Sequence, residues 1–437
     1  MKCLKSNYKL FLILIISLIF LKSHAQEHGG CATPEFNEEE EYKSGCDHTS
    51  DTWINKYRTP GHWIPDENTP IKTIMVNWIV CRDDNGQNGW QDVPEFHESV
   101  SSLFDKVNLE YSTSLPKGYS LTCEPEYTHV EDTRIRFELN EVIFIDKTEF
   151  NLGCSATDIL DYVFAQYPDA RNFLNHIFTQ GDAPCIPGAW GRYNIYWEED
   201  VSYVHTWGSM WHEWYADFFD HSYHVIHEYA HAVGLHHVYN AEYRCTSHYD
   251  FLDDVFGLCA EAGCNSCGSG NCDGNQVCYL RYDCFWQYNT VNTPIMSAAY
   301  DIRYISPKSA GRMHRALSLY DRTFKVNNKP MHKYVKEDYS YEIPLTITEN
   351  ETWDFAIKMY QDIVVEQGAT LTISCDVKMP IDGKIIVKPG GKLIIDGGYV
   401  TSAHNKLWQG IEVWGNPNAS QEEDESGNYQ QGYLELM

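Results

Sequence analysis

The stretch HEYAHAVGLHH, residues 227 to 237, constrains the fold of this chain more than any other. In an α-helix, residues four apart lie on nearly the same face, about 6 Å apart along the axis, so His227 and His231 could bind one metal ion. Glu228 flanks that face. His224 lies about 10.5 Å of helix rise from His231, too far for metal–nitrogen bonds near 2.0 Å to close on one ion.

A third ligand is therefore expected from beyond the helix. Gly234 permits a positive φ, which ends a helix sharply and sends the chain back beneath the metal. Either His236 or His237 could then be the ligand. Three neutral imidazoles, one open position and a nearby carboxylate are what a zinc peptidase requires.

The same residues match HExxHxxGxxH, the motif of the metzincin zinc proteases, which the chain resembles. Leu235, the RYNIYW strand at 192–197 and YISPKSAGRMHRAL at 304–317 resemble the pappalysin (cytophagalysin) family of secreted bacterial metalloproteases. The resemblance covers roughly residues 65 to 325.

This resemblance implies residue roles. It makes His237, rather than His236, the third zinc ligand beside His227 and His231, and it makes Glu228 the general base.

The metzincin resemblance also implies a methionine in a tight turn beneath the ligands, for which Met296 is the candidate. Relatives often carry a tyrosine two residues later that stabilises the tetrahedral intermediate. Ala298 stands there in this chain, so the nearest candidate for that role is Tyr300.

The N-terminus indicates export. Residues 1–25 combine lysines, an apolar run and a small-x-small site before Gln26, which is typical of a secretory signal peptide and places the protein outside the cell. No other stretch reaches membrane-spanning length. With 33 basic against 62 acidic residues, the net charge of −29 argues against nucleic-acid or anionic-membrane partners. Some carboxylates could hold structural Ca²⁺, and the oligomeric state is left open.

The cysteines of an exported protein favour disulfides over zinc knuckles. Twelve of them fall between Cys46 and Cys284, an even number that could close completely, including Cys81. Cys31 lies apart, in a polar segment at 26–64 interpreted as a pro-segment or N-terminal arm. The family resemblance implies a latency switch in which the Cys31 thiolate occupies the fourth zinc position, although Ala32 replaces the usual glycine. The alternative is a disulfide, for example to Cys375.

Between residues 65 and 335 the pattern predicts a twisted sheet backed by helices, an α+β catalytic domain with a zinc cleft and Met-turn. The expected elements are strands at 72–81, 133–146 and 192–197, and helices at 93–111, 157–178 (broken near Pro168), 216–234 and 308–324.

Residues 336–437 change in character. The segments at 361–374 and 383–398 repeat one pattern of short apolar strand, Gly-containing turn and short strand, offset by 22 residues from Ile363 to Ile385. This spacing suits successive coils of a β-solenoid or parallel β-helix, which 408–415 and 432–437 would continue. Because the chain ends on an apolar strand with no cap, it is interpreted as a piece of a longer protein.

Two classes of function follow. The first is a secreted zinc endopeptidase acting on protein or peptide substrates. The second is a non-catalytic surface or adhesion protein whose β-solenoid acts and whose zinc is structural. A structural site closes the fourth zinc position with a protein ligand, and the motif supplies an unliganded glutamate instead, which favours the enzyme. A pectate-lyase-like β-helix enzyme is disfavoured because too few coils are present to form an active groove.

Overall fold

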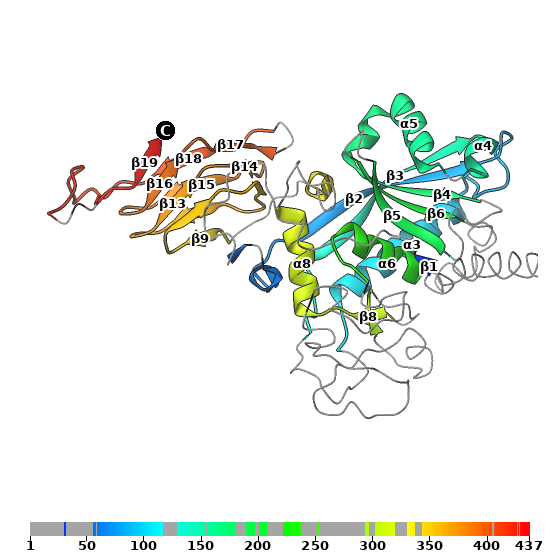
Figure 1. Ribbon diagram of the computed structural model, residues 1–437, viewed down its shortest axis with the longest axis horizontal. Helices are drawn as coiled ribbons and strands as arrows, with labels where there is room; N and C mark the ends of the chain where they lie inside the picture. Colours follow the sequence, from blue (N-terminus) through cyan, green and yellow to red (C-terminus); the bar gives the residue numbers. More distant parts are fainter. Residues whose placement is uncertain are drawn as a thin grey trace, which may run out of the picture.

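The computed structural model describes most of two units of the chain (Figure 1). The described residues are 30–31, 56–57, 59–116, 129–153, 155–180, 189–196, 201–207, 222–237, 252, 293–296, 302–319, 330–336, 343–403, 406–425, 427 and 429–437. The expected signal peptide, most of the N-terminal arm, the cysteine-rich loop and Tyr300 lie outside them.

The first unit is built on a six-stranded sheet of order β1-β5-β6-β4-β2-β3. Every pair is parallel except β5–β6, which is antiparallel. The strands are β1 (Gly30–Cys31), β2 (Lys72–Arg82), β3 (Ile135–Asp146), β4 (Leu174–Thr179), β5 (Ala189–Tyr196) and β6 (Val201–Trp207). The predicted α+β class is confirmed.

Both faces of this sheet are covered, which explains the nearly unbroken apolar run of β2. Trp78 and Val80 point into a core shared with α3 (Pro94–Ser112), α6 (Ser222–Ala232) and α8 (Pro307–Ser318). Ile79 and Cys81 point into the opposite core, against α5 (Ala156–Gln166). The sheet is thus held between two helical layers, and α6 lies directly on it.

The expected helix at 157–178 is wrong in its second half. The chain leaves α5 at Gln166, makes a 3-10 turn η3 (Pro168–Asn172), and then enters the sheet as β4, whose six residues are all buried. A strand buried on both faces has no alternation to distinguish it from a buried helix. The helices α6 and α8 are also shorter in the described residues than 216–234 and 308–324.

The expected closure of all twelve central cysteines is also wrong. Cys81 is a fully buried free thiol in the core beneath α5, and burial raises its pKa well above that of an ordinary thiol. Cys375, which stands outside that group in the sequence, is disulfide-bonded.

The second unit is a three-sided stack of short parallel strands, and the predicted β-solenoid is confirmed. The 22-residue offset corresponds to one coil, because Ile363 pairs with Ile385 in register. Gly368 and Gly390 occupy the same corner of successive coils with φ of 83° and 79°, joined by a backbone hydrogen bond of 2.8 Å.

The solenoid strands form three parallel sheets of order β10-β13-β16-β19, β11-β14-β17 and β18-β15-β12-β9. Their bounds are β9 (Leu345–Ile347), β10 (Glu351–Trp353), β11 (Ile357–Lys358), β12 (Ile363–Val365), β13 (Thr370–Ile373), β14 (Asp376–Met379), β15 (Lys384–Val387), β16 (Lys392–Ile395), β17 (Tyr399–Ser402), β18 (Gly410–Val413) and β19 (Tyr433–Leu436).

The two units meet at α8, which lies between the sheet and the solenoid in Figure 1. The Tyr360 hydroxyl donates to the carbonyl of Leu317 at 2.6 Å, and Leu319 forms an antiparallel bridge with Ile357. The 3-10 turn η2 (Pro60–Trp63) packs so closely on α8 that a Cβ on Gly311 would lie 2.1 Å from the Pro60 oxygen. No helix among the described residues is long and apolar enough to cross a membrane.

Candidate metal centre

Helix α6 carries the first part of the motif. His227, Glu228 and His231 are all buried, between 1% and 6% exposed. The opposite face of the helix packs on the sheet through Val225, Ile226 and Tyr229. Helical spacing therefore directs the two histidines away from the main core together, as the sequence predicted.

Gly234 turns the chain after α6. Its φ is 102°, a conformation that strongly favours glycine, and the amide of Leu235 donates back to the Ala230 carbonyl at 3.0 Å, as in a Schellman cap. A side chain here would also meet α8, since a Cβ on Gly234 would lie 2.8 Å from that of Ala316. The turn returns the chain toward the helix, and His237 follows it.

Three imidazoles converge at this turn. The Nε2 atom of His237 lies 3.0 Å from that of His231 and 3.1 Å from that of His227. These three residues form the one group of three or more potential metal-ligating side chains among the described residues, with ligand atoms within 4.8 Å of one another. His236 is also buried but does not belong to the group.

The opposite nitrogens of two rings are held by backbone carbonyls. Nδ1 of His231 lies 2.8 Å from the Leu235 oxygen, and Nδ1 of His227 lies 3.2 Å from the Ile295 oxygen. Because a carbonyl only accepts, each Nδ1 carries the proton and each Nε2 keeps its lone pair. Converging lone pairs repel one another unless a cation lies between them.

The donor set fits zinc. Tetrahedral ligands at 2.0–2.1 Å from an ion are about 3.3 Å apart, close to the observed nitrogen separations. Burial lowers the pKa of His227 well below its usual value, and the neighbouring His237 and His224 lower it further, so the ring is in the neutral form that binds a metal. His227, His231 and His237 would hold the ion, and no other described residue belongs to the group.

A buried chain of hydrogen bonds behind α6, which we call the polar chain, was not predicted from the sequence. Trp78 Nε1 donates to the Tyr229 hydroxyl at 3.2 Å, Tyr229 pairs with His176 Nδ1 at 3.1 Å, and His176 Nε2 pairs with Thr206 at 2.8 Å. Trp78, His176 and Thr206 lie on β2, β4 and β6, so these hydrogen bonds link helix α6 to three strands. The signal available was the histidine inside the apolar run FLNHIF.

Of the three remaining candidate residues, the structure describes Met296 and the backbone of Cys31. Met296 is buried beside Ile295, in the same core as α6. Tyr300 lies outside the described residues. The backbone of Cys31 lies in β1, which runs parallel to β5 with Gly30 opposite Ala189 and Cys31 opposite Gly191. Gly30 and Cys31 thus lie at the edge of the sheet.

Comparisons with known proteins give a limited likeness. No family model matches the chain, and a search of curated proteins finds no match. Among solved structures, a promirolysin mutant of Tannerella forsythia is 13% identical with a TM-score of 0.40, covering 70% of this chain and 97% of that one. Mature mirolysin of Tannerella forsythia in complex with a cleaved peptide is 14% identical with a TM-score of 0.38, covering 62% and 100%.

Proposed function

We propose that this chain is a secreted zinc-dependent endopeptidase. The observation that carries the proposal is the convergence of three Nε2 lone pairs, from His227, His231 and His237. Glu228, which follows His227 on α6, is buried as well. An open metal position with a neighbouring carboxylate is the arrangement that peptide hydrolysis requires, whereas a structural zinc site is closed by a fourth protein ligand.

Each residue has a defined role in this mechanism. When bound, zinc polarises the scissile carbonyl and lowers the pKa of water at the open position. Glu228 takes the proton from the attacking water and passes it to the leaving amine. His227 and His231 are held in their ligating tautomer by the Ile295 and Leu235 carbonyls. Met296 would support the site from beneath, and Tyr300 is the candidate that would stabilise the tetrahedral intermediate.

We expect an extended peptide substrate to bind along strand β5. It is the strand that β1 pairs with at the edge of the sheet, and a substrate could add to the same backbone groups once β1 has left. This mode of binding suits cleavage within a polypeptide.

The same pairing supports a latent form controlled by Cys31. A thiolate is a good zinc ligand and would fill the position that water needs. We propose that the N-terminal segment holds the enzyme inactive until it is cleaved or displaced.

The enzyme and the adhesion protein are distinguished by removing the metal. Purified mature protein should cleave casein, lose this activity on treatment with a zinc chelator, and regain it when Zn²⁺ is returned. A structural zinc site predicts the opposite result: no cleavage at any stage, and loss of the folded state on chelation.

A further inference from the structure

The junction between the two units contains a cavity of about 410 Å³ that the zinc site does not use. Its walls are largely aromatic and aliphatic, contributed by η2, the start of β2, α8 and the first coil of the solenoid. Its polar lining includes Lys72, His314, Ser318 and Lys358. The carboxylate of Asp66 also lines it and accepts hydrogen bonds from Asn68 and Thr69. We call it the junction pocket.

Lys72 is a buried charged group in the wall of this pocket. Its side chain is 3% exposed, and its ammonium donates to the Ser318 hydroxyl at 2.8 Å and to the His314 carbonyl at 3.2 Å. The same ammonium lies 4.5 Å from the centre of the Tyr360 ring. An ammonium has three donors, and these contacts account for two of them.

No carboxylate of the described residues forms an ion pair with Lys72. The neighbouring cation is Lys358, which is also buried and lies 5.0 Å from the same Tyr360 ring. Burial lowers the pKa of Lys72 well below its usual value, and the charge of Lys358 lowers it further. A buried charge without a counter-charge is costly, and a bound anion would relieve that cost.

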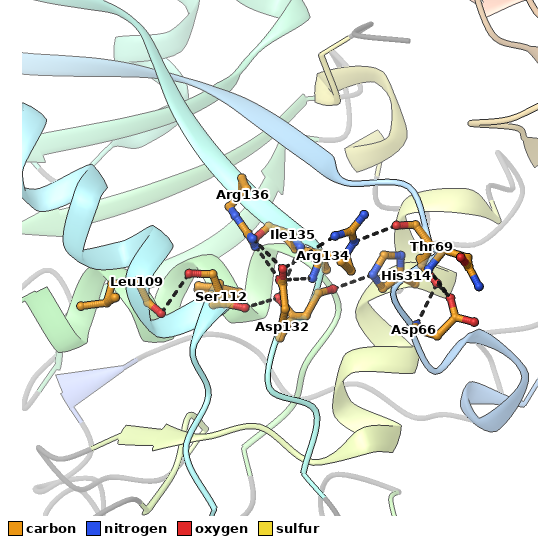
Figure 2. Close-up of polar contacts among 12 residues, drawn as sticks. Asp66, Thr69, Leu109, Ser112, Asp132, Arg134, Ile135, Arg136 and His314 are labelled. Atoms are coloured by element: carbon orange, nitrogen blue, oxygen red, sulfur yellow. Dashed lines mark hydrogen bonds and ion pairs between the residues drawn. The ribbon is translucent and has the colours of Figure 1, made fainter. Parts of the chain in front are cut away.

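His314 adds a second polar group to the pocket. Figure 2 shows it beside the cluster of Asp132, Arg134 and Thr69, and its Nε2 lies 2.7 Å from the Thr133 carbonyl, to which it donates. Its buried Nδ1 has no hydrogen-bond partner among the described residues. In its protonated form, which a nearby anion favours, this nitrogen would become a donor.

We propose that the junction pocket binds a small carboxylate carried on an apolar or aromatic body. The carboxylate would lie against Lys72 and the Nδ1 of His314, and the apolar body against Trp63, Ile343 and Met359. A free aryl-alkyl acid and the C-terminal residue of a short peptide share this chemistry.

The pocket is separate from the zinc centre. His314 and Ser318 are four residues apart on one face of α8, and both line the pocket. Ala316, which Gly234 approaches, lies about 160° around the helix from each of them. Binding to the pocket is therefore expected to be independent of Glu228.

The test is calorimetric titration of the full chain with three probes. These are 3-phenylpropionate, its uncharged analogue 3-phenylpropanamide, and N-acetylphenylalanine as a mimic of a peptide C-terminus. The carboxylate should bind with a Kd at or below about 1 mM and at least about tenfold more tightly than the amide. Tighter binding of N-acetylphenylalanine would assign the ligand to peptide termini, and tighter binding of 3-phenylpropionate to free acids.

Variants locate the binding. Ile343→Trp places a large ring at the pocket wall without changing either lysine and should weaken carboxylate binding about tenfold or more. Ile71→Trp is the matched control, because Ile71 is similarly exposed (40% against 45%) but does not line the pocket, and should bind as the wild type does. If the carboxylate bound at the zinc centre instead, the two variants would bind it equally well.

Lys72→Met tests the charge. If the variant has a native circular dichroism spectrum, its preference for the acid over the amide should disappear. If it does not fold, the Ile343→Trp comparison decides. The proposal is overturned if the wild type does not bind either acid at millimolar concentration, if acid and amide bind equally, or if Ile343→Trp binds as tightly as Ile71→Trp.

Discussion

The carbonyl oxygen of Ile295 lies 3.2 Å from Nδ1 of His227, which joins the turn before Met296 to the first histidine of the motif. Two segments nearly seventy residues apart in the chain therefore define one ring's tautomer and orientation. The candidate metal centre is built from this turn, from helix α6 and from the Gly234 turn together.

Replacing Gly234 by alanine should weaken zinc binding and lower the free energy of unfolding. The φ of 102° costs an L-residue about 1–2 kcal/mol, and the new Cβ would lie 2.8 Å from that of Ala316. Zinc competition and urea unfolding measure the two effects. Gly61→Ala is the control, because a Cβ there meets nothing within 4 Å. Equal zinc affinity in the two variants would contradict the role of the turn.

Tyr229→Phe should lower the free energy of unfolding by about 1–3 kcal/mol, because it leaves Trp78 Nε1 and His176 Nδ1 buried without their partner. Tyr162→Phe on α5 is the matched control, since no hydrogen bond of its hydroxyl is found among the described residues. Urea unfolding of the two variants gives the difference. If both lose the same stability, the polar chain does not stabilise the ligand helix.

Acid should destabilise the fold through its buried neutral histidines. Burial holds the pKa of His176 and of His314 well below 6.5, the value expected in the unfolded chain. The unfolded state therefore binds protons first, and the free energy of unfolding falls as the pH drops below about 6.5 toward the folded-state pKa. Unfolding in urea at about pH 7.5 and about pH 5.5 measures this loss. His314→Gln keeps a donor for the Thr133 carbonyl but cannot titrate, so its free energy of unfolding should fall less between these two pH values. A fall equal to that of the wild type would show that His314 does not contribute to the pH dependence.

The number of free thiols tests the state of Cys31. The chain has 15 cysteines, and removal of Cys3 with the proposed signal peptide would leave 14. With Cys81 unpaired, an odd number would then remain, so the proposed latent form, as a monomer, would hold at least one further thiol. Alkylation of the denatured, unreduced latent protein should label Cys81 and Cys31, and Cys31→Ala should speed self-activation. Labelling of Cys81 together with a different cysteine, or unchanged latency in the variant, would remove Cys31 as the switch.

How far the sequence predicted the structure depended on periodicity. The pairing of Ile363 with Ile385 was readable because strand and turn recur at a fixed spacing. The HExxH helix could be predicted because histidines four residues apart share one face of a helix. The turn at Gly234 could be predicted because glycine readily adopts a positive φ. Strand β4 was not, because burial on both faces removes the alternation that identifies a strand.

Other features could not be predicted from local sequence because they arise from contacts between distant segments. The pairing of Gly30–Cys31 with β5 carries no local signal, since two residues have no period. Cys81 counted as a disulfide candidate until its position in the core beneath α5 was known. The choice of His237 over His236 came from family resemblance, and the described structure groups His237, not His236, with His227 and His231.

The most direct test of the central claim compares three variants for zinc content and casein cleavage. Glu228→Ala should keep about one zinc per chain and lose cleavage, because the ligands remain while the general base is gone. His237→Ala should lose zinc and activity together, and His236→Ala, the adjacent buried control, should keep both. Cleavage of casein by Glu228→Ala at the wild-type rate would contradict the account.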